Sequence, residues 1–321
     1  MQHLRIFTPE AMVPAVLDLL RHDPAVTCLT HLPGAVVDPA GDLIEADLPR
    51  EAVNEVLDTL RAIGVQREGS IHLGPVPAWL SQAGFDSERV TPGSSADAVV
   101  WADVTQRAYE ESELNWTYLT FMSLATLIAS IAIVLDSQIL VIGAMVLGPE
   151  FIPIAALGLA LVRRRPSLFY FAARSLLVGF VVAIAVATLF ALVGRALGWI
   201  VVDQVTAPRP ATAFIYTPDK WSFIVALIAA AAGALSLTSA KVGGLSGVFI
   251  SVTTIPAAGN VALGLAFWLP DEILGSVLQL AVNMGGMAVA GWLTLAFQQA
   301  VWSRMSARRM RFVERLRARR A

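Results

Sequence analysis

Residues 137–161 read SQILVIGAMVLGPEFIPIAALGLAL, a hydrophobic stretch of transmembrane length with Pro149 and Pro153 near its middle. A second stretch of this kind, residues 243–268, reads GGLSGVFISVTTIPAAGNVALGLAFW and contains Pro256. A helix in lipid has no water to satisfy the backbone groups that proline frees, so such breaks persist only where protein or a wet cavity covers them. Two broken helices at corresponding places are typical of the central site of a transporter.

The composition predicts an integral membrane protein. Of the 321 residues, 56% are hydrophobic and only 15% are charged, which excludes a soluble protein of ordinary composition. Six hydrophobic segments come close to the roughly 20 residues that a bilayer requires. They cover residues 117–135, 137–161, 172–197, 222–239, 243–268 and 276–302. The very short links after the first and fourth segments predict antiparallel hairpins.

The positive charges predict the orientation of these segments in the cytoplasmic (inner) membrane. No apolar signal-peptide core opens the chain, so we expect the N-terminus in the cytoplasm. The cytoplasmic side then receives Arg163, Arg164, Arg165, Arg174, Lys241 and the eight arginines of residues 304–320. The outer side receives Arg195, Arg209 and Lys220. We therefore expect a multi-pass protein with both termini in the cytoplasm.

The membrane region also predicts an internal repeat. An offset of about 105 residues superposes the first three segments on the last three, and it brings Leu157-Gly158-Leu159-Ala160 next to Leu263-Gly264-Leu265-Ala266. Because each half has three spans, the second half must enter the membrane from the opposite side. The expected fold of residues 117–302 is an α-helical core of six spans, built as a 3+3 inverted repeat with broken second and fifth helices.

The first 76 residues predict a small cytoplasmic domain. Strand patterns at residues 3–7, 26–37, 42–48 and 70–73 alternate with amphipathic helix patterns after Pro9 and at residues 50–63. This βαββαβ order is the ferredoxin-like α+β arrangement. Cys28 is the only cysteine, and we expect it to be a small buried thiol.

Two further segments flank the membrane region. Residues 77–116 predict a linker followed by a juxtamembrane helix, and residues 303–321 form a basic tail. The tail directly follows a membrane segment, so attraction to anionic lipid headgroups explains its arginines more simply than nucleic acid does. A contact with the acidic N-terminal domain is an alternative.

Several motifs resemble a known family. The run Ile142-Gly143-Ala144-Met145-Val146-Leu147-Gly148-Pro149, with Ser130-Ile131-Ala132 and Asp136-Ser137 before it, is similar to the core signature of the uncharacterised bacterial and archaeal membrane proteins grouped as domain of unknown function 389. Gly244, Gly247-Val248, Ile250-Ser251-Val252 and Pro256 resemble the second signature of that family, and the resemblance covers roughly residues 100–270. Many members carry leucine where this chain has Glu150. The resemblance implies an inner-membrane protein and leaves its substrate open.

The candidate substrate- or ion-binding residues lie at the two breaks. They are Gly148, Pro149, Glu150 and Pro153 at the first break, and Thr253, Thr254, Pro256 and Asn260 at the second. Ser130, Asn283 and Lys241 are secondary candidates. Each proline frees a backbone carbonyl that a cation or a solute can use. The N-terminus of each half-helix suits an anion or a carboxylate.

Glu150 is the most specific of these candidates. A charged side chain near the middle of the bilayer costs about 2.5–3.5 kcal/mol. One hypothesis is that Glu150 binds H⁺ or Na⁺ and couples that ion to the movement of a solute. The alternative is a protonated or hydrogen-bonded glutamate that satisfies the broken helix or a subunit contact. We expect no other cofactor and no metal centre, since the membrane segments contain no histidine or cysteine.

The sequence favours a secondary transporter or ion-coupled exchanger of a small solute, regulated by a ligand of the N-terminal domain. A gated ion channel with the same breaks and a membrane-anchored sensor or scaffold without transport are alternatives. The chain has no Walker-type phosphate loop, so we expect no enzyme. The expected partners are the lipid bilayer, a small solute or ion, and further copies of the chain in a homo-oligomer.

Overall fold

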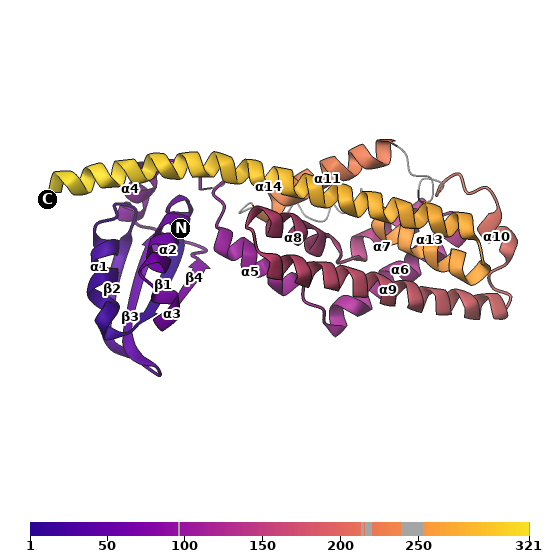
Figure 1. Ribbon diagram of the computed structural model, residues 1–321, viewed down its shortest axis with the longest axis horizontal. Helices are drawn as coiled ribbons and strands as arrows, with labels where there is room; N and C mark the ends of the chain where they lie inside the picture. Colours follow the sequence, from indigo (N-terminus) through magenta and orange to yellow (C-terminus); the bar gives the residue numbers. More distant parts are fainter. Residues whose placement is uncertain (96, 213–214, 216–219, 239–252, 321) are drawn as a thin grey trace. The chain divides into compact units, whose positions relative to one another are not determined.

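The computed structural model of the chain describes residues 1–95, 97–212, 215, 220–238 and 253–320 (Figure 1). Internal contacts divide the chain into two compact units. The N-terminal unit comprises Met1–Val104, Thr238–Ala240 and Gln298–Ala321, and the helical unit comprises Thr105–Leu237 and Lys241–Phe297. All the candidate site residues that the structure describes belong to the helical unit.

The N-terminal unit is built on a four-stranded antiparallel sheet with the strand order β2-β3-β1-β4. The strands are β1 (Gln2–Thr8), β2 (Thr27–Val37), β3 (Ala40–Leu48) and β4 (Ser70–Pro75). Between them lie the 3-10 turn η1 (Glu10–Met12) and the helices α1 (Val13–Arg21), α2 (Arg50–Ala62) and α3 (Val65–Glu68). The predicted strands and the second predicted helix are present with ends shifted by at most two residues, whereas α3 was not predicted.

One face of this sheet forms the core of the N-terminal unit. Ile6 of β1 pairs with Ile44 of β3, and both are fully buried. They share one hydrophobic cluster with Val16 of α1 and with Val56 and Leu60 of α2. The alternating apolar residues of the strands and the apolar stripe of each helix therefore pack into one core.

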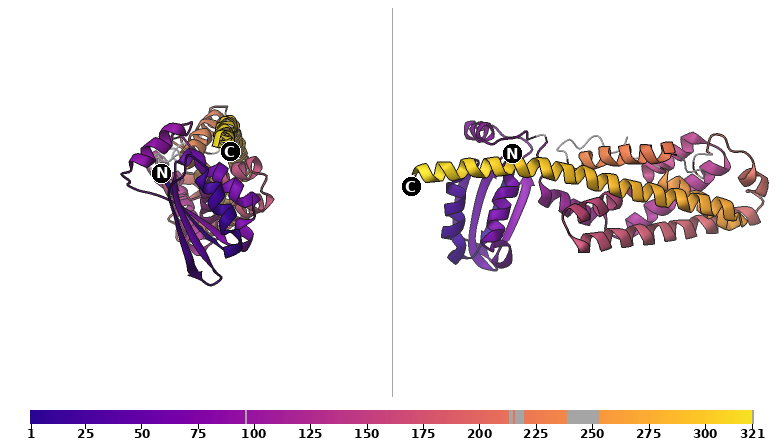
Figure 2. Two further views of the ribbon diagram at one scale, coloured as in Figure 1. Left: turned by 90° about the vertical axis from the view of Figure 1, so that its left-hand side faces the viewer. Right: turned by 45° about the horizontal axis from the view of Figure 1, so that its top comes forward.

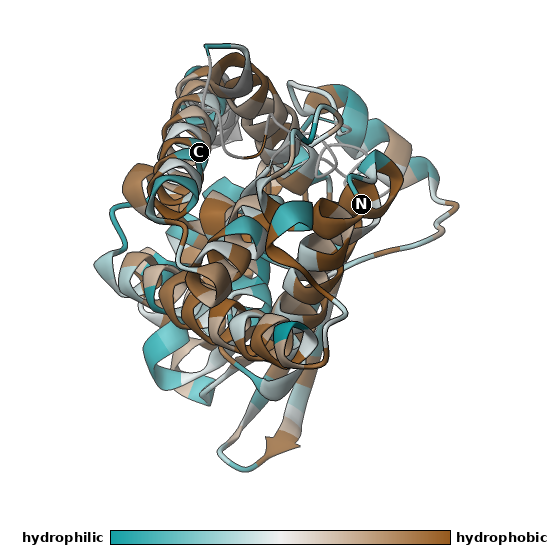
Figure 3. Cartoon of the chain, turned by 90° about the vertical axis from the view of Figure 1, so that its right-hand side faces the viewer, coloured by the Kyte–Doolittle hydropathy of each residue, from teal (hydrophilic) through white to brown (hydrophobic). Residues whose placement is uncertain are grey.

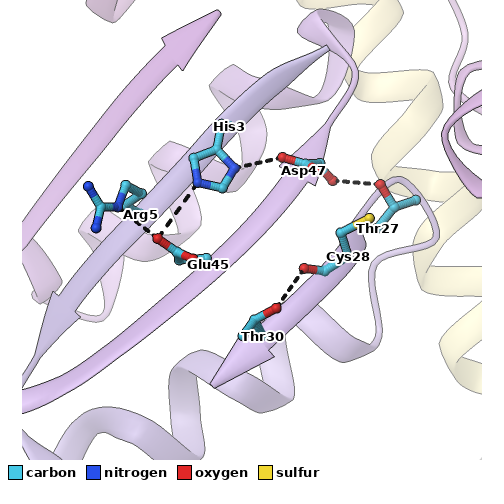
Figure 4. Close-up of polar contacts among 7 residues, drawn as sticks. All are labelled: His3, Arg5, Thr27, Cys28, Thr30, Glu45 and Asp47. Atoms are coloured by element: carbon cyan, nitrogen blue, oxygen red, sulfur yellow. Dashed lines mark hydrogen bonds and ion pairs between the residues drawn. The ribbon is translucent and has the colours of Figure 1, made fainter. Parts of the chain in front are cut away.

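The opposite face of the sheet carries paired charges (Figure 4). His3 Nδ1 lies 2.7 Å from Asp47 Oδ1, and Arg5 Nε donates to Glu45 Oε1 at 2.8 Å. At the edge strand β2, Cys28 is exposed, so the expectation of a buried thiol is wrong. The pairing of β2 with β3 shifts register between Thr27 and Thr30, and Cys28 has a positive φ of 51° there. The alternating strand pattern does not predict such an irregularity.

Two helices follow the sheet along the chain. The predicted linker contains α4 (Gln82–Val90), which was not predicted and begins where the Ser81 hydroxyl accepts from Gly84 N at 3.1 Å. The predicted juxtamembrane helix is α5 (Trp101–Glu111). Asn54 of α2 holds its start, since its side chain donates to Val99 O at 2.6 Å and accepts from Trp101 N at 3.1 Å.

Glu51 in the first turn of α2 makes the N-terminal unit sensitive to pH. Its side chain is 8% exposed, and Oε2 has no hydrogen-bond partner among the described residues. Burial raises the pKa of this carboxyl above its ordinary value, and the nearby Glu88 charge adds to the shift. Because the folded state holds the proton more tightly, Glu51 destabilises the fold as the pH rises from its ordinary pKa through its folded pKa.

Replacing Glu51 with glutamine is therefore expected to raise the apparent melting temperature of the full-length chain by a few degrees at pH 7. The gain should vanish near pH 4, where Glu51 is protonated in both the folded and the unfolded chain. Differential scanning fluorimetry in detergent measures both values, with the exposed Glu10→Gln as the matched control. An equal gain at both pH values would show that the carboxyl charge is not its cause.

The helical unit contains the segments predicted to be membrane spans. Its helices are α6 (Trp116–Val134), α7 (Gln138–Leu147), α8 (Phe151–Val162), α9 (Pro166–Ala196), α10 (Val202–Thr206), α11 (Lys220–Thr238), α13 (Thr254–Phe267) and the first part of α14 (Pro270–Arg320). The views in Figure 2 show the long helices of this unit running alongside one another. α6, α9 and α13 pack pairwise, as do α6 with α7 and α8 with α9.

Within the described residues, three helices are long and apolar enough to cross a membrane: Trp116–Val134, Pro166–Ala196 and Pro270–Arg304. A fourth span is formed if α7 and α8, which meet at an angle of 53°, are counted together. Phe223–Thr238 and Thr254–Phe267 are shorter apolar helices. They correspond to the fourth predicted span and to the second half of the fifth, whose first half lies outside the described residues.

The outer faces of these helices are apolar. Figure 3 shows hydrophobic residues along the helices of the helical unit. Leu177 on α9 is 68% exposed, and Leu274 and Leu278 on α14 are similarly open. Large exposed apolar side chains in such numbers are typical of a surface that faces lipid. These long apolar helices are those of a multi-pass membrane protein.

Candidate functional site

The first break separates α7 from α8. Gly148 leaves the helical conformation, with φ −69° and ψ 126°, because the following Pro149 disfavours the helical conformation at the residue before it. Glu150 then precedes α8, and Pro153 is the third residue of that helix. The first turn of a helix has no partner for its N–H groups, so proline is tolerated there. Pro256 is likewise the third residue of α13, so α8 and α13 begin alike. The residues directly before Thr253, on the other side of the second predicted break, lie outside the described residues.

The first break lies against the start of α13. Thr254 Oγ1 donates to Glu150 Oε1 at 2.6 Å, and a Cβ on Gly148 would lie 2.6 Å from Ile255 Cγ1. Glu150 is only 7% exposed. Its second oxygen, Oε2, has no hydrogen-bond partner among the described residues. The first break and the start of α13 thus meet around a buried carboxyl, of which one oxygen has a hydrogen-bond partner among the described residues.

Thr253, next to Thr254, connects this region to α14. Its hydroxyl oxygen accepts from Asn283 Nδ2 at 2.8 Å and from Gln279 Nε2 at 3.2 Å. Both amide side chains are fully buried. Gln279 Oε1 and Asn283 Oδ1 have no hydrogen-bond partner among the described residues. We call these five residues the break cluster: Glu150, Thr253, Thr254, Gln279 and Asn283.

A second buried group lies further along α13. Arg209 donates to Asn260 Oδ1 at 3.1 Å through Nη1 and to Glu272 Oε1 at 2.8 Å through Nη2. Asn260 Nδ2 donates to Glu272 Oε2 at 2.7 Å and to Ser276 Oγ at 2.8 Å. The Arg209 side chain is 3% exposed and that of Glu272 is 21% exposed. We call Arg209, Asn260, Glu272 and Ser276 the arginine cluster.

The segment that carries Arg209 is fixed from a second side. Asp136, in the turn between α6 and α7, accepts from Thr212 Oγ1 at 2.8 Å and from Ala211 N at 3.3 Å. Asp136 has a positive φ of 45°, a conformation that aspartate tolerates better than most residues. The turn after α6 and the start of α14 therefore hold the same short segment.

The two clusters lie on one face of each of two helices. Glu272, Ser276, Gln279 and Asn283 are spaced four, three and four residues apart on α14, which places them along one side of that helix. Thr253 and Asn260 are seven residues apart on α13, a distance of about 10 Å. Only Trp268 and Leu269 separate α13 from α14, so the helices form an antiparallel hairpin. We call this line of buried polar side chains between α13 and α14 the polar seam.

The structure separates the predicted site residues into these two places. Gly148, Pro149, Glu150, Thr253, Thr254 and Asn283 lie together, whereas Asn260 belongs to the arginine cluster. Ser130 lies between them along α13, since its hydroxyl donates to Gly259 O at 3.3 Å as well as to Thr126 O. Lys241 lies outside the described residues.

Four residues of the two clusters were not among the predicted site residues: Arg209, Glu272, Ser276 and Gln279. Arg209 was predicted only as a charge on the outer side of the membrane. The spacing of the polar residues on residues 272–283 was the signal that could have identified Glu272 and Ser276. Nothing in the sequence marks Arg209 as buried. Within the described part of the chain, no group of three or more His, Cys, Asp or Glu side chains could hold a metal ion.

Comparison with known proteins gives one match. Residues 145–289 match the family model described as Domain of unknown function (DUF389), which confirms the resemblance seen in the sequence. The matched region includes every residue of both clusters. Asp136, which holds the segment of Arg209, lies before it. No curated protein and no solved structure matches the chain. The chain therefore carries a DUF389 domain, and the polar seam lies inside it.

Proposed function

We propose that the chain is a secondary transporter, in which a small solute or ion crosses the inner membrane along the polar seam. The proposed architecture is a six-span core built as a 3+3 inverted repeat, with a ferredoxin-like domain and both termini in the cytoplasm. The equivalent positions of Pro153 and Pro256 in α8 and α13 support the repeat. The strand order β2-β3-β1-β4 with two helices on one face supports the ferredoxin-like arrangement.

The observation that carries the proposal is the polar seam itself. Over residues 274–283 of α14, polar side chains are buried and several apolar ones are exposed. Ser276, Gln279 and Asn283 are buried, whereas Leu274 and Leu278 are exposed. Polar residues inside a membrane protein often serve only to join helices. Groups that join helices are normally satisfied, however, and within the described part of the chain three acceptor oxygens of the break cluster have no donor. Acceptors left open in a buried site indicate a ligand rather than packing.

The arginine cluster supports the same proposal from the other end of the seam. The buried Arg209 guanidinium, in the segment between α10 and α11, is costly to desolvate, and a buried charge with several polar partners is a candidate binding group. Here it is neutralised by Glu272, the more exposed member of the pair. An anionic group of a solute could compete with Glu272 for the Arg209 guanidinium. We therefore place the solute at the arginine cluster and the coupling chemistry at the break cluster.

Counterflow in vesicles tests transport. The purified full-length chain is reconstituted, the vesicles are loaded with one unlabelled solute, and uptake of the same labelled solute is followed. The solutes are tested in turn: amino acids, short carboxylates, inorganic phosphate and ²²Na⁺. Saturable counterflow of at least one solute is the expected result. Current without counterflow would favour a channel instead, and neither current nor counterflow would favour a sensor or scaffold.

Two variants of α14 then connect transport to the seam. Ser276→Val removes an acceptor of Asn260 in the middle of the seam, and we expect counterflow to fall about tenfold, as for one buried hydrogen bond lost. Val277→Ala is the matched control, because Val277 is the next residue and lies on the exposed face. Equal effects of the two substitutions would place the pathway elsewhere.

A further inference from the structure

We infer that the break cluster binds one desolvated alkali cation, of which Na⁺ is the representative, through Glu150 Oε2, Gln279 Oε1 and Asn283 Oδ1. The inference deepens the proposed function, because a role of this cation in coupling rests on transport. Cation binding itself does not depend on transport and is measured separately. The unpartnered oxygens, the charge of the cluster and the fixed position of the Glu150 carboxyl support this inference.

The first step is the type of atom left open. Glu150, Gln279 and Asn283 are each more than nine-tenths buried, and each has one oxygen without a hydrogen-bond partner among the described residues. The two amide groups both turn their NH₂ toward Thr253 Oγ1, so their carbonyl oxygens are the free ends. The residues that hold these side chains, Thr253 and Thr254, are consecutive. The three atoms of the cluster that have no partner within the described part of the chain are acceptor oxygens, which are the ligands that a hard cation prefers.

The second step is the charge. A buried carboxylate without a positive partner is costly, and no lysine, arginine or histidine among the described residues forms an ion pair with Glu150. One monovalent cation neutralises one carboxylate. A divalent cation would leave a net positive charge in the apolar interior, and the described residues contain no group of three acidic or imidazole ligands that would compensate it.

The third step separates an alkali cation from a proton. A proton on Glu150 Oε2 would neutralise the carboxyl, but the resulting O–H donates a single hydrogen bond. The proton could therefore satisfy at most one of the two amide oxygens. An alkali cation coordinates several oxygens at once, so it satisfies the carboxylate and both amides together.

The fourth step is the position of the carboxyl. The Thr254 hydroxyl donates to Oε1 at 2.6 Å and so fixes the rotation of the carboxyl group. Oε2 then points to the side of Gly148, where a Cβ would contact it directly. Glycine at this position avoids a clash with this oxygen and with Ile255. The break thus supplies the charged ligand and fixes the place of its unpartnered oxygen.

Thermal stability and direct binding test the site on the full-length chain in detergent. The chain is titrated with NaCl against choline chloride at constant ionic strength, and ²²Na⁺ binding is measured by scintillation proximity. We expect a saturable rise of several degrees in the apparent melting temperature with Na⁺ and about one bound Na⁺ per chain. Glu150→Gln and Asn283→Leu should each abolish both effects. Glu113→Gln, an exposed carboxyl near the start of the membrane region, should retain them.

The two variants guard against loss of the fold, because Glu150→Gln keeps the shape of the side chain and Asn283→Leu keeps the carboxyl. Absence of any Na⁺ effect in the wild-type chain would overturn the inference, as would an undiminished effect in both variants. A stability that depends on pH and on Glu150, but not on Na⁺, would show that the site takes a proton and would also overturn it. Na⁺ binding without counterflow of any solute would leave this site intact and reject the transporter.

Discussion

Replacing Arg209 with methionine is expected to lower the stability of the chain by about 3–5 kcal/mol, the usual cost of removing one partner of a buried ion pair. Methionine keeps much of the length and the apolar stem of the side chain. It leaves Glu272 Oε1 and Asn260 Oδ1 without the two donors that the guanidinium supplies at 2.8 and 3.1 Å. For a unit of this size, the apparent melting temperature should fall by roughly 10 °C.

Two companion variants identify the cause of this loss. Arg209→Met combined with Glu272→Gln should recover part of the stability, because the neutral amide no longer leaves an uncompensated charge in the interior. Arg174→Met removes an exposed arginine from α9 and should change the melting temperature little. If the double variant is as unstable as Arg209→Met alone, packing of the guanidinium rather than its charge pairing holds the arginine cluster together.

Substitution of Gly148 by alanine is the second change for which we expect a large effect. The added methyl group would contact Glu150 Oε2 and would lie 2.6 Å from Ile255 Cγ1, closer than real carbon atoms approach. The backbone of Gly148 is in a region open to alanine, so the cost is steric rather than conformational. Overpacking of this kind costs about 1–3 kcal/mol, and here it also displaces the carboxyl.

Gly143 provides the matched control for this experiment. It lies in α7, five residues before Gly148, and a Cβ there would have no other atom within 4 Å. Gly143→Ala should therefore be neutral or stabilising, by up to about 1 kcal/mol from helix propensity. Melting temperatures of the two variants in detergent should change in opposite directions. If Gly148→Ala is tolerated as well as Gly143→Ala, the first break and the start of α13 do not pack as tightly as we describe.

The sequence predicted elements better than it predicted their contacts. Hydrophobic length and proline placement located the helices around Pro149 and Pro256, because these signals are local properties of the chain. Alternation along β1 and β3 located the sheet for the same reason. α4 was missed because its start depends on one serine cap in a segment rich in glycine and proline.

The contacts of the site depend on distant residues and were less accessible. Asn260 is four residues from Pro256, which suggested that it belongs to the break. On a helix, however, the separation of six positions from Thr254 to Asn260 spans about 9 Å, and Asn260 reaches Arg209 and Glu272 instead. Arg209 looked like an ordinary charge at a membrane surface. Its burial comes from tertiary contacts with α13 and α14, which no local pattern encodes.

The short turn between α13 and α14 limits how the seam can open. With two residues between Phe267 and Pro270, the helices cannot slide past each other and can only swing apart about the turn. Asn260 lies about 10 Å from this pivot and Thr253 about 21 Å. Any angular opening of the hairpin therefore separates Thr253 from Asn283 about twice as far as it separates Asn260 from Glu272. A rotation that opens the arginine cluster slightly would therefore open the break cluster, with its Thr254–Glu150 hydrogen bond, more widely.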